Sequence, residues 1–466
     1  MKHIKSKINN SERGSILIYE LVLIFVLSVV IMGLLSTSVY YFKVLRSTGY
    51  REQAFHIAEA GINYYQWHLA HFPTDYQDGT GQSGPYVHDY VDADTQQVLG
   101  QYSLNITPPV IGSTLVTISS TGWTTEQPNI RRTVTVRYGI PSLAKYGFLT
   151  NSYIHIGSTS VFNGEFHSNS GVQFDGTGNA PITSARQTYN CSGGSNDDCS
   201  GNHNGIWGSA PASTQAYWQY PVPNVDYSAI TADMASIKTA AQTNGKYLAP
   251  SNDDGYRLVF LSDGTYRVYR VTSLQNDPTG YDATGASHSE NVDYQNSTQL
   301  STTCNPYPCA MPANGVIFVE DKVWVEGTVN GRVLVAAGIL PYNPATAPSI
   351  HIQNNIIYAA QDGNDVLGLI AQQNVLITHD APSNLTIHGA LIAQYGAFQR
   401  YRYPNTLKNT LAVYGSISSY GRAAIYYGDS GYQTRNYTYD GFLLYGPPPS
   451  FPLSSSDYQQ ISWTSD

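Results

Sequence analysis

The chain has 466 residues, of which only 12% are charged, and its formal net charge is −9. This length allows two or three domains. With so few charges, its 38 tyrosines and 41 glycines are typical of an exported, β-rich protein. Because no basic run occurs outside the first residues, the sequence lacks the electrostatic footprint of a nucleic-acid-binding protein, and we expect no nucleic-acid partner.

The first predicted element is an apolar helix over Ile16–Phe42 that carries a single charge, Glu20. About twenty apolar residues suffice to cross a bilayer as a helix. Basic residues precede the apolar run and predict a cytoplasmic N-terminus: Lys2, Lys5, Lys7 and Arg13. The run lacks the short apolar core and small-residue cleavage site of a secretory signal. We therefore expect this helix to remain on the mature protein and everything after about residue 45 to be exported.

The residues around the start of this helix, Ser11-Glu12-Arg13-Gly14-Ser15-Ile16-Leu17-Ile18-Tyr19-Glu20, resemble the class III leader of type IV prepilins. The resemblance implies cleavage after Gly14 by a prepilin peptidase, with Ser15 becoming the methylated first residue. It also implies that Glu20 pairs with a neighbouring N-terminal amine during filament assembly. Glu20 would be the sixth mature residue, whereas the acid of the family is usually the fifth. The alternative is a simple signal anchor, in which Glu20 lies at the membrane interface.

The helix continues beyond the membrane to about Phe72, so that residues 1–14 form the leader and 15–72 one membrane-spanning and stem helix. Apolar residues recur at steps of four and three, which indicates one helix face: Ala54, Ala58, Ile62, Tyr65, Leu69 and Phe72. Pro73 then ends the helix. The segment Ala58-Glu59-Ala60-Gly61-Ile62 resembles the "AEAGI" segment of PilX-type minor pilins, a family that tolerates a poor match near its cleavage site.

A small antiparallel sheet is predicted to follow, within a pilin-like head at 74–140. Residues 74–93 read as a loop, and β-branched or alternating patterns predict strands at Gly100–Ile106, Thr114–Ser119 and Arg131–Tyr138. Pro141 and Ser142 mark its boundary.

Residues 147–445 predict a β-solenoid, that is, a parallel β-helix. Leu369-Ile370-Ala371-Gln372 returns unchanged at 391–394, 22 residues later, and a looser pattern of short strand, polar or aromatic residue and Gly occurs four times, at 161–164, 328–331, 386–389 and 412–415. Stacked rungs of this length need such short strands and glycine corners. An ordinary β-sandwich is the alternative. Residues 446–466 read as a Pro/Ser-rich tail, which makes the predicted fold α+β but mainly β.

A predicted insertion at about 175–310 interrupts the solenoid. Ile230, Met234, Ile237 and Ala241 indicate one amphipathic helix, and Arg257–Leu261 and Thr265–Val271 a β-hairpin. The insertion also holds the four cysteines of the chain as two tight pairs, Cys191 with Cys199 and Cys304 with Cys309. In an exported protein these predict two local disulfides. A zinc site is the alternative, although neither pair has the two-residue gap that zinc sites prefer.

An active site would require acids converging on one groove. The candidates are Glu320, Glu326, Asp362, Asp365 and Asp380, and none is flanked by a motif that supplies a basic partner. Five histidines on predicted strands lack metal-ligand spacing and are interpreted as filler: His155, His167, His351, His379 and His388. Asp277-Pro278-Thr279-Gly280 is interpreted as a turn. We therefore expect no enzyme activity, no cofactor and no metal.

The resemblance implies a minor, PilX-like pilus subunit that leaves the inner membrane for the pilus or cell surface. Its partners would be the prepilin peptidase, other pilins through Ile16–Phe42, and a surface or carbohydrate ligand suited to the polar insertion. Two alternatives stay open: a membrane-anchored, carbohydrate-active β-helix enzyme (lyase or hydrolase) and a secretion-system pseudopilin.

Overall fold

A computed structural model describes residues 12–191, 199–227 and 233–466. It divides into two compact units, one made of residues up to 107, 117–137 and 460–466, and the other of residues 108–116 and 138–459. Most of the predicted leader at 1–14, and Ile230 of the predicted amphipathic helix, lie outside the described residues. The protein is mainly β, with one long N-terminal helix, a small antiparallel sheet and a large parallel solenoid, as the sequence predicts.

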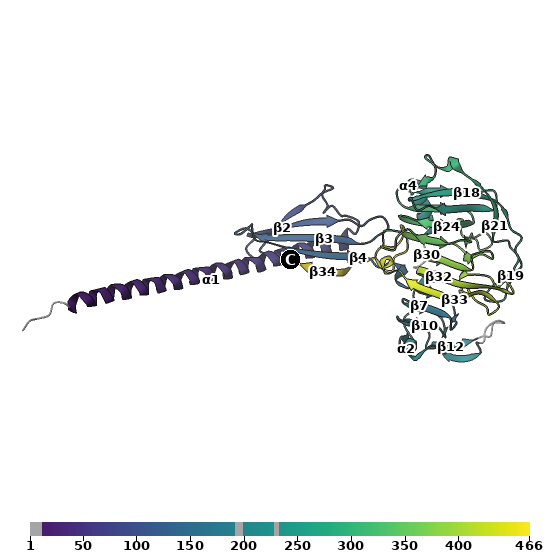
Figure 1. Ribbon diagram of the computed structural model, residues 1–466. Coiled ribbons are helices and arrows are strands. Elements are labelled where there is room, and N and C mark those ends of the chain that lie inside the picture. The colour runs from purple at the N-terminus through teal and green to yellow at the C-terminus, as the bar shows by residue number, and fades with distance from the viewer. Residues whose placement is uncertain (1–11, 192–198, 228–232) are drawn as a thin grey trace, which may run out of the picture. The chain divides into compact units, whose positions relative to one another are not determined.

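The first unit is built on helix α1 (Glu12–His71), shown in purple and blue in Figure 1. Five of the six residues on its predicted apolar face are buried: Ala54, Ala58, Ile62, Tyr65 and Leu69. Phe72 instead lies just beyond the helix and is 53% exposed. Pro73 follows at once, in agreement with its predicted role as a helix terminator.

Small residues bring α1 unusually close to its sheet. A Cβ on Gly122 would lie 2.3 Å from the carbonyl oxygen of Ala54 and 2.5 Å from the amide nitrogen of Ala58. On the helix side, a Cβ on Gly61 would lie 2.3 Å from Ser120 Oγ. The Ala-x-x-Gly-Ile spacing of residues 58–62 therefore has a packing role, because larger side chains would push helix and sheet apart.

The sheet of this unit has the order β1-β2-β3-β4-β34. Its strands are β1 (Tyr86–Val91), β2 (Val98–Thr107), β3 (Val116–Thr124), β4 (Arg131–Gly139) and β34 (Gln459–Ser465). The three predicted strands correspond to β2, β3 and β4. The prediction of a loop over 74–93 was wrong for β1, an edge strand whose half-exposed residues give little apolar alternation. The 446–466 segment is likewise no free tail, since β34 pairs with β4.

The second unit is a solenoid of parallel strands. Its first face stacks, in spatial order, β16 (Lys246–Leu248), β23 (Val316–Val319), β25 (Arg332–Ala337), β28 (Val366–Ala371), β30 (Asn384–Ala393), β32 (Thr406–Ser419), β5 (Phe148–Thr150), β8 (Phe166–Ser168), β11 (Ile182–Ser184) and β15 (Trp218–Gln219). The parallel pairing excludes the sandwich alternative, whose sheets would be antiparallel.

Further parallel series complete the rungs. One contains β17 (Gly255–Phe260), β24 (Val323–Val329), β26 (Ile350–Ile352), β29 (Val375–Ile377) and β31 (Phe398–Gln399). Another joins β24 to β27 (Ile356–Tyr358), β30, β32, β33 (Ser430–Tyr439), β7 (Ser160–Asn163) and β10 (Thr177–Gly178). Beside them lie β6 (Ile154–Ile156), β9 (Val172–Phe174) and β14 (Ile206–Trp207).

Chain order and spatial order differ in this solenoid. The early rungs, β5 to β15, stack on the late strands β32 and β33 rather than on the next rung in sequence. The chain then returns to the opposite end of the stack at β16 and winds back toward its own beginning. The two ends of the solenoid sequence therefore meet inside the stack.

The remaining elements of the second unit are antiparallel strands and helices outside these parallel series. Antiparallel strands are β18 (Thr265–Leu274), β21 (Tyr294–Gln299), β22 (Cys309–Ala310), the pair β12 (Thr188–Cys191) and β13 (Gly201–Asn204), and the pair β19 (Gly280–Tyr281) and β20 (Ser287–His288). Short helices are η1 (Leu143–Lys145), α2 (Ala212–Gln215), η2 (Ser301–Thr303) and η3 (Gly441–Leu444); α4 (Met234–Asn244) is longer.

The sequence repeat has a structural cause. Leu369, Ile370 and Ala371 of β28 pair in register with Leu391, Ile392 and Ala393 of β30. Leu369 points into the solenoid core, whereas Ile370 belongs to an outer cluster that Met234, Ile237 and Ala241 of α4 also join. Both faces of these strands are covered, which explains their continuous apolar runs.

The predicted insertion at 175–310 was too long. Strands β10, β11, β14, β15, β16 and β17 fall within it and are themselves parts of rungs. Strands of two to six residues give too short a pattern to be recognised. The predicted hairpin is present as β17 and β18, with Arg257 opposite Tyr269.

Candidate functional site

The N-terminal part of α1 exposes an apolar surface. From Ile16 to Leu45 the large apolar side chains are between 43% and 74% exposed, and no part of the described chain covers them. By length and composition, α1 could cross a membrane. Glu20 lies on this surface, and Gly14 and Ser15 belong to the helical backbone just before it. Cleavage after Gly14 and a role of Glu20 in assembly stay predictions.

A polar pocket of about 640 Å³ opens on the solenoid beside β6. Its lining includes His155, Asp175, Arg402, Arg422, Arg435 and Tyr426. His155 Nε2 lies 2.8 Å from Asp175 Oδ2. Burial opposes ionisation of Asp175, but hydrogen bonds from Ser209 and His155 lower its pKa overall. The pocket thus combines a carboxylate, guanidinium groups and an aromatic ring, which suits a polar ligand with many hydroxyls or an acidic group.

The five candidate acids have separate sets of partners. Glu320 pairs with Lys238 and accepts a hydrogen bond from Tyr247, while Glu326 pairs with Arg257. Both ion pairs join residues far apart in sequence, so the basic partners of Glu320 and Glu326 could not be found in the motifs that flank them.

The other three candidate acids serve turns or a neighbouring histidine. Asp365 accepts hydrogen bonds from the amides of Gly331 and Ala360, at 2.7 Å each, and Asp362 accepts one from the amide of Asn364. Asp380 Oδ1 lies 3.0 Å from His379 Nδ1. Thus these carboxylates stabilise local backbone or orient a side chain.

Three of the five histidines are buried among residues of the solenoid. Burial lowers the pKa of His167, His351 and His388. His351 stacks on Trp324 at a ring-centroid distance of 4.7 Å, and His388 Nδ1 accepts a hydrogen bond from the Tyr358 amide. His155 and His379 instead meet acids.

Asp277, Asp293 and His379 form a compact cluster, in which one potential ligand atom of each residue lies within 4.8 Å of the other two. Asp277 and Asp293 belong to the connection between β18 and β21, and His379 follows β29. Sequence reasoning missed this cluster because His379 lies more than 80 residues after both aspartates, and Asp277 was interpreted only as part of a turn.

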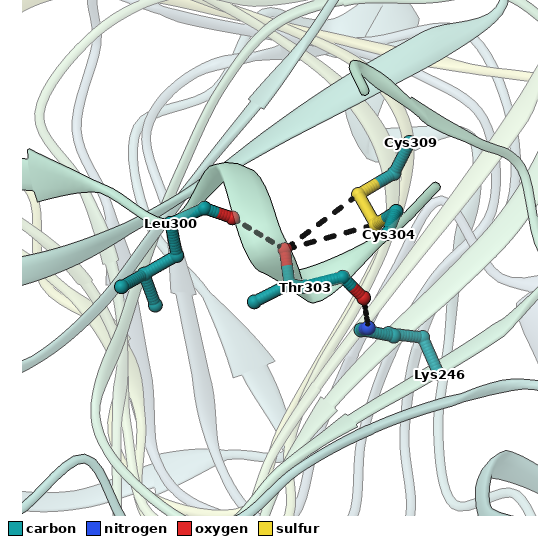
Figure 2. The surroundings of a disulfide bond; sticks show 5 residues. All are labelled: Lys246, Leu300, Thr303, Cys304 and Cys309. Carbon is teal, nitrogen blue, oxygen red and sulfur yellow. Dashed lines mark hydrogen bonds between the residues drawn. A yellow bond between two sulfur atoms is a disulfide. The ribbon is translucent and has the colours of Figure 1, made fainter. Parts of the chain in front are cut away.

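Both predicted disulfides are present. The Cα atoms are 5.5 Å apart in Cys191–Cys199 and 5.3 Å apart in Cys304–Cys309. Figure 2 shows Thr303 beside the second bond, with its hydroxyl 3.7 Å from Cys304 Sγ and donating to the Leu300 carbonyl. Lys246, on β16, donates to the Thr303 carbonyl and so ties this loop to a rung. With the sulfurs paired, neither cysteine pair offers thiolates for zinc.

No family model and no curated protein matches this chain. Among solved structures, the competence-associated pilin ComZ from Thermus thermophilus is similar over 90% of this chain and 97% of its own, with 14% sequence identity and a TM-score of 0.30. These values are too low to establish a common fold.

Proposed function

We propose that this chain is a minor, PilX-like type IV pilus subunit with a large exported head. The observation that carries the proposal is the division of α1. Its first half exposes an apolar surface with Glu20 as the only charge between residues 16 and 42, and its second half packs on an antiparallel sheet. A filament subunit needs both surfaces on one helix, the first for the membrane and then for neighbouring subunits, the second for its own head.

The position of Glu20 supports this assignment over a simple anchor. A carboxylate within hydrocarbon costs several kcal/mol unless it has a partner, so an acid inside an apolar helix points to a function. A pilin supplies such a partner in the N-terminal amine of an adjacent subunit. A membrane-anchored enzyme would have no use for this charge, which places that alternative second.

The test is the mature N-terminus of the chain in sheared filaments, determined by mass spectrometry. We expect a chain that begins at Ser15, and we expect Gly14→Ala to retain the leader and to stay in the membrane. Gly49→Ala is the matched control, since Gly49 lies on the same helix beyond Ile16–Phe42 and a Cβ there meets nothing within 4 Å. An intact Met1 found only in the membrane fraction would contradict the proposal and favour the anchored enzyme.

A second experiment addresses Glu20 itself. We expect Glu20→Gln to leave cleavage after Gly14 intact but to lower the amount of this subunit in sheared filaments at least tenfold. Glu52→Gln, at an exposed acid later on the same helix, should leave incorporation unchanged. Equal incorporation of both variants would show that the one-residue offset removes Glu20 from assembly.

The head would then contact a surface or carbohydrate, and the polar pocket beside β6 is the region suited to it. Tyr426 and Tyr342 are each 39% exposed, but only Tyr426 lines the pocket. On a panel of immobilised neutral and acidic glycans, Tyr426→Ala should weaken binding of the full chain at least fivefold and Tyr342→Ala should not. No binding by the wild type, or equal loss in both variants, would rule out the pocket as a glycan site.

A further inference from the structure

We propose that Asp277, Asp293 and His379 bind a divalent transition-metal ion such as Zn²⁺, which fastens the connection between β18 and β21 to the solenoid. The three side chains come from two separate parts of the chain, and their potential ligand atoms lie within 4.8 Å of one another. Two carboxylates and one imidazole form a donor set that Zn²⁺ or Mn²⁺ accepts, whereas Ca²⁺ and Mg²⁺ prefer oxygen ligands alone.

Asp293 is the second, independent observation. Its side chain is fully buried, and its Oδ2 accepts a hydrogen bond from the Asp380 amide at 3.0 Å, whereas its Oδ1 makes no hydrogen bond of ordinary geometry within the described chain. The hydroxyl oxygen of the adjacent, fully buried Thr378 is in the same state. A buried carboxylate with one oxygen unpaired and no cation bound to it is costly. A cation held between Asp293 and its neighbours would remove that cost.

Backbone and side-chain contacts already orient the ligands. Asp277 Oδ2 accepts hydrogen bonds from the amides of Val292 and Asp293, at 2.6 and 3.0 Å. The imidazole of His379 contacts Asp380 Oδ1 and packs edge-on against Tyr403, at a ring-centroid distance of 4.7 Å. A carboxylate that contacts the ring of a ligating histidine is a common outer-shell arrangement in metal sites.

The local charge is also unbalanced without a cation. Asp277, Asp293 and Asp380 supply three carboxylates, and Arg400 and Lys408 are the cations near them. Arg400 donates its hydrogen bonds to Tyr401, Ser430 and His379 oxygens, and Lys408 to the Ala381 carbonyl, rather than to Asp293.

The test is titration of the detergent-solubilised, chelator-treated full chain with Zn²⁺ and, separately, with Ca²⁺, followed by calorimetry. We expect the wild type to bind one more equivalent of Zn²⁺ than Asp293→Asn or His379→Gln does. The wild type should bind this additional Zn²⁺ at least tenfold more tightly than it binds Ca²⁺. Zn²⁺ should also slow amide exchange over residues 275–293 in the wild type only. Asp457→Asn and His71→Gln, at exposed positions, are the matched controls and should bind as the wild type does.

Equal Zn²⁺ stoichiometry in the wild type and both variants would overturn the proposal, as would tighter binding of Ca²⁺. Circular dichroism and intact disulfides establish that each variant is folded. Should Asp293→Asn fail to fold, His379→Gln decides alone, because this side chain is 24% exposed and its loss leaves no unpaired buried charge. Neither outcome depends on whether the chain enters a filament.

Discussion

At the scale of single residues, the solenoid buries several ionisable groups and compensates them in different ways. Glu326, only 6% exposed, pairs with Arg257 and accepts a hydrogen bond from Asn354 at 2.5 Å. His351 pairs with no acid among the described residues and lies flat against Trp324. Removing one member of a buried pair is costly, whereas a buried neutral ring adds stability only while it stays neutral.

This difference predicts a pH dependence for His351. Burial lowers its pKa to about 3, against about 6.5 in the unfolded chain. Between these values only the unfolded chain binds the proton, so stability is complete above about pH 6.5 and falls as the pH drops. Urea unfolding followed by tryptophan fluorescence measures the free energy of unfolding at pH 7.5 and at pH 4.5. Between these pH values, His351→Phe should lose about 3 kcal/mol less of this free energy than the wild type does.

The exposed His71 supplies the control for that measurement, since His71→Phe also removes one imidazole. This variant should follow the acid dependence of the wild type. The same acid slope in His351→Phe and in the wild type would show that His351 is not held neutral in the fold.

The sequence predicts a site well where residues of suitable chemistry lie close together in the chain. The cysteine pairs are eight and five residues apart, so a local bond was the simplest prediction. The ion pair between Arg257 and Glu326, and the proximity of Asp277 to His379, depend on which rungs become neighbours. Without an alignment to show which distant positions vary together, such pairings could not be predicted.

At the scale of elements, the solenoid depends on glycine where its strands change direction. Gly389 and Gly415 pair in register and have φ angles of +158° and +146°. Gly164 repeats this conformation, with φ of +146°. The copy at 328–331 is shifted in register by two residues, because Val329 pairs with Tyr358, whereas Ile387 pairs with Ile356. The repeat thus predicted the corner and its main residue, but not the register of every copy.

Gly415→Ala tests this corner. A Cβ at Gly415 would lie 1.9 Å from the Gly389 carbonyl oxygen, whereas one at Gly331 would meet nothing within 4 Å despite its φ of +109°. We expect Gly331→Ala to cost about 1–3 kcal/mol of unfolding free energy from backbone strain alone. Gly415→Ala should cost more, because the steric clash is added to that strain. Chemical denaturation compares them, and an equal or reversed order would contradict the stacking.

Whether a strand could be predicted from the sequence depended on its length. The β17–β18 hairpin was predicted because each strand is at least six residues long and Ser262-Asp263-Gly264 marks the turn. Strands such as β10 and β14, with two residues each, were not, because alternation cannot appear in so short a stretch. These short strands form because neighbouring rungs pair with them, and the sequence of a single rung does not show which rungs will be neighbours.

At the scale of the whole molecule, the chain leaves the antiparallel sheet after β4 and returns to it as β34. The last residue contributes as well: Asp466 Oδ1 accepts a hydrogen bond from the Thr133 amide at 2.7 Å, and the Asp466 amide donates to the Thr133 carbonyl. The solenoid is therefore an insertion into the sheet-bearing unit, bounded on both sides by strands of one sheet.

Deletion of residues 459–466 should open the edge of β4. We expect faster amide exchange along β4 and a stronger tendency to aggregate, because an unpaired strand edge recruits other strands. Hydrogen exchange by mass spectrometry measures the first effect, with Gln460→Ser as a control that keeps the backbone of β34. Unchanged exchange in β4 after the deletion would show that β34 contributes nothing to this sheet.

The meeting of early and late rungs also sets the order in which the head can be completed. Strands β5 and β7 have as partners β32 and β33, and Ser160 pairs with Arg435 across some 275 residues of sequence. A chain synthesised from its N-terminus therefore presents open strand edges until nearly all of it is available for folding. Only a full-length polypeptide can close that seam. Closure of this seam thus distinguishes complete solenoids from truncated ones, whose strand edges stay open to other strands.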